Sequence, residues 1–158
     1  MKKVLLFIAI TASVITEAQV STVSLQASGL TCSMCSNAIN KSLKTLGFVL
    51  EVNADIKTYT FEISFKPGST IDFDILKNKV ESAGFTVCAF VATIHFNNVQ
   101  VTNNQPVVIQ NKTLLFQHVN DQILNGEKQI RLLDKGFVSA NLPCQPISIW
   151  LVNFQYKK

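Results

Sequence analysis

Two cysteines near the start of the chain have the types and the spacing to bind a metal ion. Cys32 and Cys35 are separated by two residues, and no histidine, aspartate or glutamate occurs between residues 18 and 50. Two thiolates with no harder ligand beside them form a soft site of low coordination number. Such a site favours Cu(I), with Hg(II) as an alternative and Zn(II) less suited because it usually takes four ligands.

The residues that follow the two cysteines predict a helix that supports the sulfurs. Its apolar stripe at helical spacing consists of Ile39, Leu43 and Leu46. Gly47 is expected to end this helix in the left-handed conformation. Cys35 then falls in the first turn, where free N–H groups and the helix dipole stabilise a thiolate. Met34 is interpreted as an apolar loop residue, with a thioether ligand as the alternative.

The same pair of cysteines allows two other interpretations. A C-x-x-C pair also occurs in thiol-disulfide redox proteins, although the aromatic, glycine and proline residues usual around such sites are missing here. In an oxidising compartment Cys32 and Cys35 could instead rest as a structural disulfide. Metal binding is the favoured hypothesis.

The neighbouring segments predict the order strand, helix, strand, strand, helix, strand. Clean alternation of apolar and polar residues predicts strands at 20–28, 48–54 and 59–65, and Phe85-Thr86-Val87 begins another. A second helix is expected after Pro67-Gly68, capped by Ser69 or Thr70 and ended by Gly84. Its expected buried stripe is Ile75, Leu76, Val80 and Ala83. This β-α-β-β-α-β order is the ferredoxin-like arrangement, an α+β fold with both helices on one face of the sheet.

These residues resemble a known family, the heavy-metal-associated domain of copper chaperones, copper-exporting ATPases and periplasmic mercury-binding proteins. The resemblance covers Val20 to Val87 and is carried by Gly29-Leu30-Thr31-Cys32-Ser33-Met34-Cys35 and by Glu81-Ser82-Ala83-Gly84-Phe85. It implies a ferredoxin-like fold with Cys32 and Cys35 as metal ligands. Leu30 stands where the family usually has a methionine that packs beneath the metal loop. Phe85 stands where the family often has an aromatic residue or a lysine close to the metal.

The start of the chain has the form of a secretory signal peptide. A basic Met1-Lys2-Lys3 precedes an unbroken apolar run from Val4 to Ile10, and small and polar residues follow up to an expected cut before Gln19. The apolar run is too short to span a bilayer. We therefore expect residues 1–18 to be removed and the mature protein to be periplasmic or otherwise secreted, with no membrane association.

The composition argues against some classes of function. The net charge is only +4 and the lysines are scattered, so nucleic-acid binding gains no support. No nucleophile–base pair, paired-carboxylate cleft or phosphate-binding loop can be identified, and we do not expect an enzyme. An apolar content of 47% is sufficient for a packed core.

The second half of the chain predicts a different architecture. Helical spacing disappears after Cys88, and short alternating runs predict a small all-β module of five or six strands. Turns are expected at Asn97-Asn98 and Asn103-Asn104, and a hairpin at Asn125-Gly126. A long last strand is expected at 147–156. The predicted organisation is a signal peptide (1–18), a heavy-metal-associated domain (19–88) and a small all-β domain (89–158).

The remaining cysteines and the two histidines are less informative. Cys88 and Cys144 could form a disulfide in an exported protein, or they could be buried free thiols. A second metal site at His95 and His118 is not favoured, because isolated histidines on strands usually belong to the surface or the core.

Taken together, the residues favour an exported protein that captures or transfers a soft ion, preferably Cu(I), through Cys32 and Cys35. Its partner would be a second metal-exchanging protein. A module whose β domain binds a partner protein and a thiol-disulfide redox protein are the two alternatives.

Overall fold

A computed structural model describes residues 19–109, 112–134, 136–137, 144 and 153–157. The predicted signal peptide, residues 1–18, lies outside these residues, as does most of the predicted last strand at 147–156. The first half of the chain contains β1 (Gln19–Ser28), α1 (Ser33–Lys44), β2 (Val49–Asp55), β3 (Thr60–Phe65) and α2 (Phe73–Ser82). The second half contains β4 (Thr86–Val101), β5 (Pro106–Ile109), β6 (Lys112–Gln117), β7 (Gln122–Leu132) and β8 (Asn153–Lys157).

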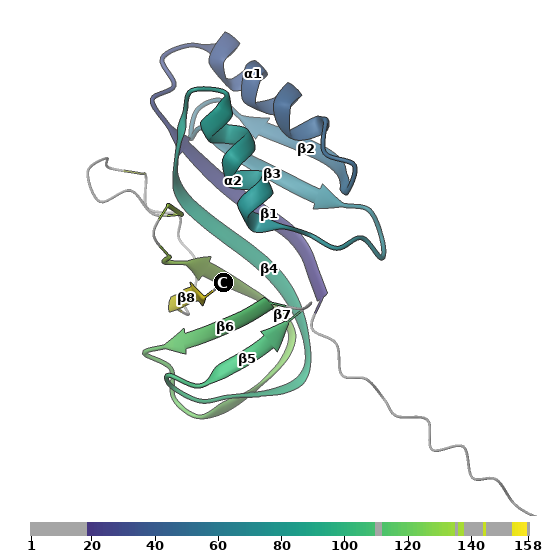
Figure 1. The fold of residues 1–158 in the computed structure, drawn as a ribbon, viewed down its shortest axis with the longest axis vertical. Helices are drawn as coiled ribbons and strands as arrows, with labels where there is room; N and C mark the ends of the chain where they lie inside the picture. Colours follow the sequence, from purple (N-terminus) through teal and green to yellow (C-terminus); the bar gives the residue numbers. More distant parts are fainter. Residues whose placement is uncertain (1–18, 110–111, 135, 138–143, 145–152, 158) are drawn as a thin grey trace, which may run out of the picture.

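The first six elements form the predicted ferredoxin-like layer. Their strands pair antiparallel in the order β2-β3-β1-β4, and both helices lie on one face of this sheet (Figure 1). The apolar residues of β1 that the alternation placed on one face, Val23, Leu25 and Ala27, are buried, as are Phe61, Ile63 and Phe65 of β3. The fold class is therefore confirmed: α+β, with a ferredoxin-like arrangement followed by further β-strands.

The prediction for β2 was wrong at Leu50. The alternation at 48–54 places Leu50 on the same face as Val52, but Leu50 is 61% exposed whereas Val52 is buried. The pairing of β2 with β3 shifts register between Val49 and Glu51. Such a bulge inserts one unpaired residue and interrupts the two-residue alternation. Val49 and Val52 fill the core instead.

The predicted helix ends also needed correction. α1 ends at Lys44 with Thr45 as its C-cap, and Gly47 is not among the glycines with a left-handed backbone. α2 is capped by Asp72, whose carboxylate accepts hydrogen bonds from the backbone N–H groups of Asp74 and Ile75, rather than by Ser69 or Thr70. The helix therefore starts later than predicted, and Phe73 joins Leu76 and Val80 on its buried face while Ile75 is exposed.

In the described part of the chain, one sheet of eight strands connects the two halves. Its strand order is β2-β3-β1-β4-β7-β8-β6-β5, antiparallel everywhere except between β7 and β8. The 16-residue strand β4 pairs with β1 on one side and with β7 on the other, and Figure 1 shows it running through both halves. The boundary proposed at residues 88 and 89 falls within this strand and stays a prediction.

Two predicted turns of the second half lie inside strands. Asn97-Asn98 belongs to β4, and Asn125-Gly126 belongs to β7. Phe96 pairs with Gly126 and Val99 pairs with Leu124, so two asparagines of β4 oppose one residue of β7. Asn98 and Gly126 have φ values of 52° and 73°. Asn98 and Gly126 thus adopt the left-handed backbone that Asn and Gly tolerate, but they do so in a β-bulge and not in a hairpin turn. The predicted turn at Asn103-Asn104 is confirmed.

The two halves also share one hydrophobic core. Phe90 of β4 packs against Phe73 of α2 and against Phe137 of the second half, with ring centroids 5.2 and 5.1 Å away. Lys112 of β6 lies 3.4 Å from Asp72 at the start of α2 and over the ring of Phe73. A disulfide joins Cys88 of β4 to Cys144, which decides between the two states that the sequence left open.

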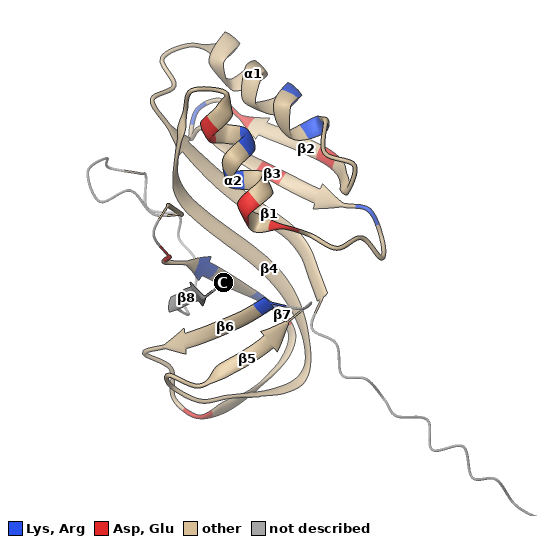
Figure 2. Cartoon of the chain, in the orientation of Figure 1, with Lys and Arg blue, Asp and Glu red and all other residues tan. Residues whose placement is uncertain are grey.

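Charged side chains are spread over the described part of the chain. Figure 2 shows blue and red segments interspersed along the helices and strands, with no long blue run among the described residues. Neither helix in the described part has the length and apolar content that a membrane span needs.

Candidate metal centre

The cysteine loop lies where β1 gives way to α1. Gly29 has a φ of +85°, a conformation that glycine adopts without strain, and this turns the chain away from the sheet. Leu30 follows and is only 7% exposed, so it anchors the loop in the core. The apolar residue that replaces the family's methionine therefore lies in the interior, as the resemblance implied.

Both sulfurs lie together at the first turn of α1. Cys32 is the N-cap residue and Cys35 lies three residues further on, with its backbone N–H donating to the carbonyl of Cys32 at 3.1 Å. The two Sγ atoms are 2.8 Å apart, and both cysteines are free thiols. Cys32 is exposed and Cys35 is half-buried. A ligand in solution can therefore reach the pair.

The start of α1 favours negative charge on these sulfurs. An N-cap side chain usually accepts a hydrogen bond from the first turn, but Cys32 makes no such bond and the first turn contains no acidic residue. The N–H groups at this end therefore keep their positive potential for a thiolate. Hydrogen bonding from Cys32 lowers the pKa of the Cys35 thiol, partial burial opposes this, and hydrogen bonds from Thr31 lower the pKa further.

Thr31 is the residue whose role the sequence did not reveal. It was noted as part of the loop, but its contribution to the pKa of Cys35, through both backbone and side chain, became visible only in the folded loop. A hydroxyl residue directly before the first cysteine was the available signal.

The surroundings of the pair add no further metal ligand. Within the described residues, no group of three or more His, Cys, Asp and Glu side chains could hold an ion. Met34 is 80% exposed on the first turn of α1. Phe85 is half-buried against the core, and its backbone N–H donates to the carbonyl of Val80. His95 and His118 are both exposed. The donor set is thus two thiols, which suits a soft cation of low coordination number.

Comparisons with known proteins agree with this description. Residues 24–86 match the family model of the heavy-metal-associated domain, and this part of the chain is a heavy-metal-associated domain. This class of domain binds heavy-metal ions. A search of curated proteins found no match.

Several solved structures are similar to part of the chain. A yeast copper transporter domain, solved in the apo and Cu(I)-loaded states, is 28% identical with a TM-score of 0.38, over 42% of this chain and 90% of its own. The N-terminal domain of a potential copper-translocating P-type ATPase from Bacillus subtilis is 22% identical with a TM-score of 0.39, over 44% of this chain and 85% of its own. A putative copper-ion-binding protein from Bacillus anthracis is 25% identical with a TM-score of 0.37, over 46% of this chain and 97% of its own. Because all three TM-scores lie below 0.5, the family of residues 24–86 rests on the family model and on the cysteine loop.

Proposed function

We propose that Cys32 and Cys35 bind one Cu(I) ion as cargo and pass it to, or take it from, a partner protein. The observation that carries this proposal is the pair of free sulfurs 2.8 Å apart at the exposed start of α1. Thiolates are the ligands that Cu(I) prefers, and the lowered pKa of Cys35 favours the thiolate form that binds metal. Hg(II) and Zn(II) are the competing ions, and Zn(II) is the weaker candidate because the described residues supply only two ligands.

The exposure of the pair supports transfer rather than storage. Cys32 is exposed and no other His, Cys, Asp or Glu group surrounds it in the described part of the chain. An incoming thiolate of a partner can therefore approach the metal before both protein ligands have left. Ligand-by-ligand exchange of this kind moves the ion without releasing it to solvent. The metal keeps its oxidation state, and each thiolate that leaves is replaced by one from the partner.

We also propose that the protein works outside the reducing cytosol. The Cys88–Cys144 disulfide supports this proposal, because disulfides persist mainly in oxidising compartments. Export is further supported by the signal-peptide pattern of residues 1–18, which suits a periplasmic or secreted protein. In such a compartment Cys32 and Cys35 must remain reduced to bind metal.

Titration of the protein with Cu(I) against a chromogenic Cu(I) chelator tests the metal site. Mild reduction keeps Cys32 and Cys35 as thiols. We expect one equivalent of Cu(I) to be withheld from the chelator, and the Cys32→Ser/Cys35→Ser variant to withhold none. The matched control is Cys88→Ala/Cys144→Ala, which removes the same number of sulfurs and should still withhold one equivalent.

The same variants distinguish the alternatives. Retention of one-equivalent binding by Cys32→Ser/Cys35→Ser would contradict the proposal. Disulfide-exchange activity that depends on Cys32 and Cys35, without tight Cu(I) binding, would favour the redox alternative. Parallel titrations with Hg(II) and Zn(II) should rank Zn(II) below Cu(I), because two thiolates leave the coordination of Zn(II) incomplete.

A further inference from the structure

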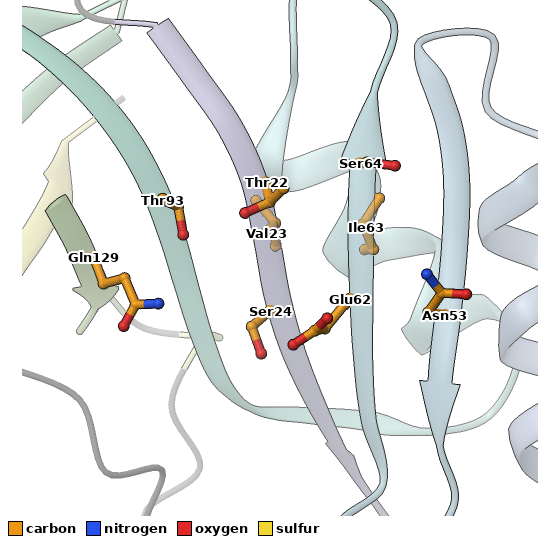
Figure 3. A pocket seen from close by; sticks show the side chains of 9 residues that line it. All are labelled: Thr22, Val23, Ser24, Asn53, Glu62, Ile63, Ser64, Thr93 and Gln129. Carbon is orange, nitrogen blue, oxygen red and sulfur yellow. The ribbon is translucent and has the colours of Figure 1, made fainter. Parts of the chain in front are cut away.

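The sheet has a polar hollow on the face that points away from the helices. The hollow has a volume of about 220 Å³ and is bordered by strands from both halves of the chain (Figure 3). Two consecutive rows of cross-strand partners build it. One row runs Gln129, Thr93, Thr22, Ser64 and Glu51, and the next runs Arg131, Val91, Ser24, Glu62 and Asn53. All of these line the hollow except Glu51, Arg131 and Val91.

The lengths of the side chains explain why a hollow forms there. The middle of the two rows carries short hydroxyl residues, which form the floor: Thr22, Ser24, Ser64 and Thr93. Longer side chains stand at the two sides, with Glu62 and Asn53 on one and Gln129 on the other. Figure 3 shows the Glu62 carboxylate lying over the gap between β1 and β3, and the amide of Gln129 turned towards the hollow from β7. Because β7 supplies Gln129, the second half of the chain completes the hollow.

The polar groups of the hollow have hydrogen-bonding capacity that the described protein does not use. In the described part of the chain, the side chains of the seven polar lining residues make no hydrogen bond or ion pair with the protein. Thr93 accepts a hydrogen bond from Ser21 only through its backbone carbonyl. Four hydroxyls, two amides and one carboxylate therefore face the same space. They can donate to and accept from a molecule rich in hydroxyl groups.

The charge of the hollow defines the ligand further. Glu62 is the only charged lining residue, and it has no ion-pair partner among the described residues. Arg131, on the same face of β7, pairs in register with Val91 and does not line the hollow. Glu51 of β2 carries a second negative charge on this face but lies outside the hollow. A ligand with one positive charge is therefore complementary to this site, and hydrogen bonds that involve a charged group are the stronger ones.

We propose that this hollow binds a small, hydroxyl-rich molecule with a single ammonium group, such as an amino sugar, through Glu62 and the surrounding hydroxyl and amide groups. Its volume lies below the range usual for drug-sized ligands, which suits a molecule the size of one sugar ring. A dissociation constant on the order of 1 mM is expected for a ligand with so few atoms in an open site. The site is separate from Cys32 and Cys35 and does not depend on metal binding.

Titration of the full chain, labelled with ¹⁵N and followed by NMR, tests the proposal with glucosamine as the probe. We expect saturable shifts confined to amides of β1, β3, β4 and β7 around the hollow. Glucose, which has the hydroxyls but not the ammonium, should bind at least about tenfold more weakly, because the charged hydrogen bond is lost. The Glu62→Gln variant keeps the shape and the hydrogen-bonding groups but removes the charge, and it should weaken glucosamine binding by about the same factor.

Glu51→Gln is the matched control, because it removes the same charge from the same face just outside the hollow. It should leave the affinity for glucosamine within about twofold, since exposed charges outside direct contact interact weakly. Equal weakening by Glu51→Gln and Glu62→Gln would overturn the proposal, because it would indicate general attraction to an acidic surface. Equal binding of glucose and glucosamine, non-saturable shifts, or shifts elsewhere on the molecule would also overturn it.

Discussion

The two pairs of cysteines have opposite surroundings in this molecule. Cys32 and Cys35 lie at the exposed start of α1 as free thiols, whereas Cys88 is buried in β4 and bonded to Cys144. The first pair belongs to the heavy-metal-associated domain, and the second pair links that half to the strands that follow. The contrast shows that position in the fold distinguishes the two free thiols from the two disulfide-bonded cysteines. A helix N-terminus favours the thiolate, while the core excludes the solvent that reductants need.

The strand β4 makes the two halves depend on each other. In the first half alone, β4 would be an edge strand, and such an edge exposes unpaired backbone groups that can pair with other chains. Here β7 covers that edge along nine paired positions. The loop with Cys32 and Cys35 is thus carried by a domain whose outer strand, β4, is paired with β7 of the second half.

Phe90→Ala should break the link between the halves most severely. The Phe90 side chain is fully buried and contacts the rings of Phe73 and Phe137, so its loss leaves a cavity that both halves share. We expect the free energy of unfolding to fall by about 3–5 kcal/mol. Urea unfolding should show this loss by circular dichroism, which follows α1 and α2, and by hydrogen exchange of β5 and β6.

The control for Phe90→Ala is Ile75→Ala on the exposed face of α2, which should change stability by less than about 0.5 kcal/mol. If hydrogen exchange of β5 and β6 were unaffected by Phe90→Ala, the two halves would not share one cooperative core.

Removal of the structural disulfide should separate stability from metal binding. The bond closes a segment of 56 residues, and Cys88→Ala/Cys144→Ala should lower the free energy of unfolding by about 4 kcal/mol through the entropy of the unfolded chain. Cu(I) stoichiometry should stay at one per chain at temperatures where the variant is folded. Calorimetry and the chelator titration measure the two quantities. A folded variant that no longer binds Cu(I) would show that the buried pair also serves the metal site.

Gly126→Ala should show how much the bulge between β4 and β7 depends on the left-handed backbone of Gly126. Gly126 has a φ of +73°, and left-handed backbone costs a residue with a Cβ about 1–2 kcal/mol. A loss of that size is expected in thermal unfolding. Gly47→Ala is the matched control, because Gly47 has ordinary backbone and open space around its Cα, so the effect should be small or stabilising. Equal effects of both substitutions would rule out backbone conformation as the cause.

The smallest expected effect is a shift in the pH at which the Cys35 thiol ionises. This effect can be measured in the folded protein. Hydrogen bonding from Cys32 lowers the pKa of Cys35, so at a given pH a larger fraction of Cys35 is thiolate than of an ordinary thiol. The midpoint of its alkylation by iodoacetamide should therefore lie at a lower pH than that of an ordinary thiol. Cys32→Ala removes the donor and should shift the midpoint for Cys35 to higher pH. Cys32→Ser keeps a hydroxyl donor and should shift it less.

Mass spectrometry of the alkylated protein measures both midpoints. Identical midpoints in Cys32→Ala and Cys32→Ser would show that hydrogen bonding from residue 32 does not control the titration of Cys35.

The accuracy of sequence-based prediction differed between local and non-local features. The order of the first six elements and the positions of Cys32 and Cys35 follow from periodicity and spacing within short segments, and the structure has that order. Leu50 was misplaced because a bulge in β2 depends on pairing with β3, which no local pattern contains. Asn125-Gly126 favours a left-handed backbone in either setting, and only the partner strand β4 decides between a turn and a bulge.

The sequence by itself determined the chemical groups and their local scaffold: two thiols three residues apart, at the start of a helix, on a β-α-β-β-α-β segment. These features depend on residue types and on short-range spacing. The tertiary structure decided how the rest is assembled, including the single sheet through β4, the bond between Cys88 and Cys144 and the hollow around Glu62. Each of these requires residues far apart in the chain to meet, and long-range strand pairing rather than local preference brings them together.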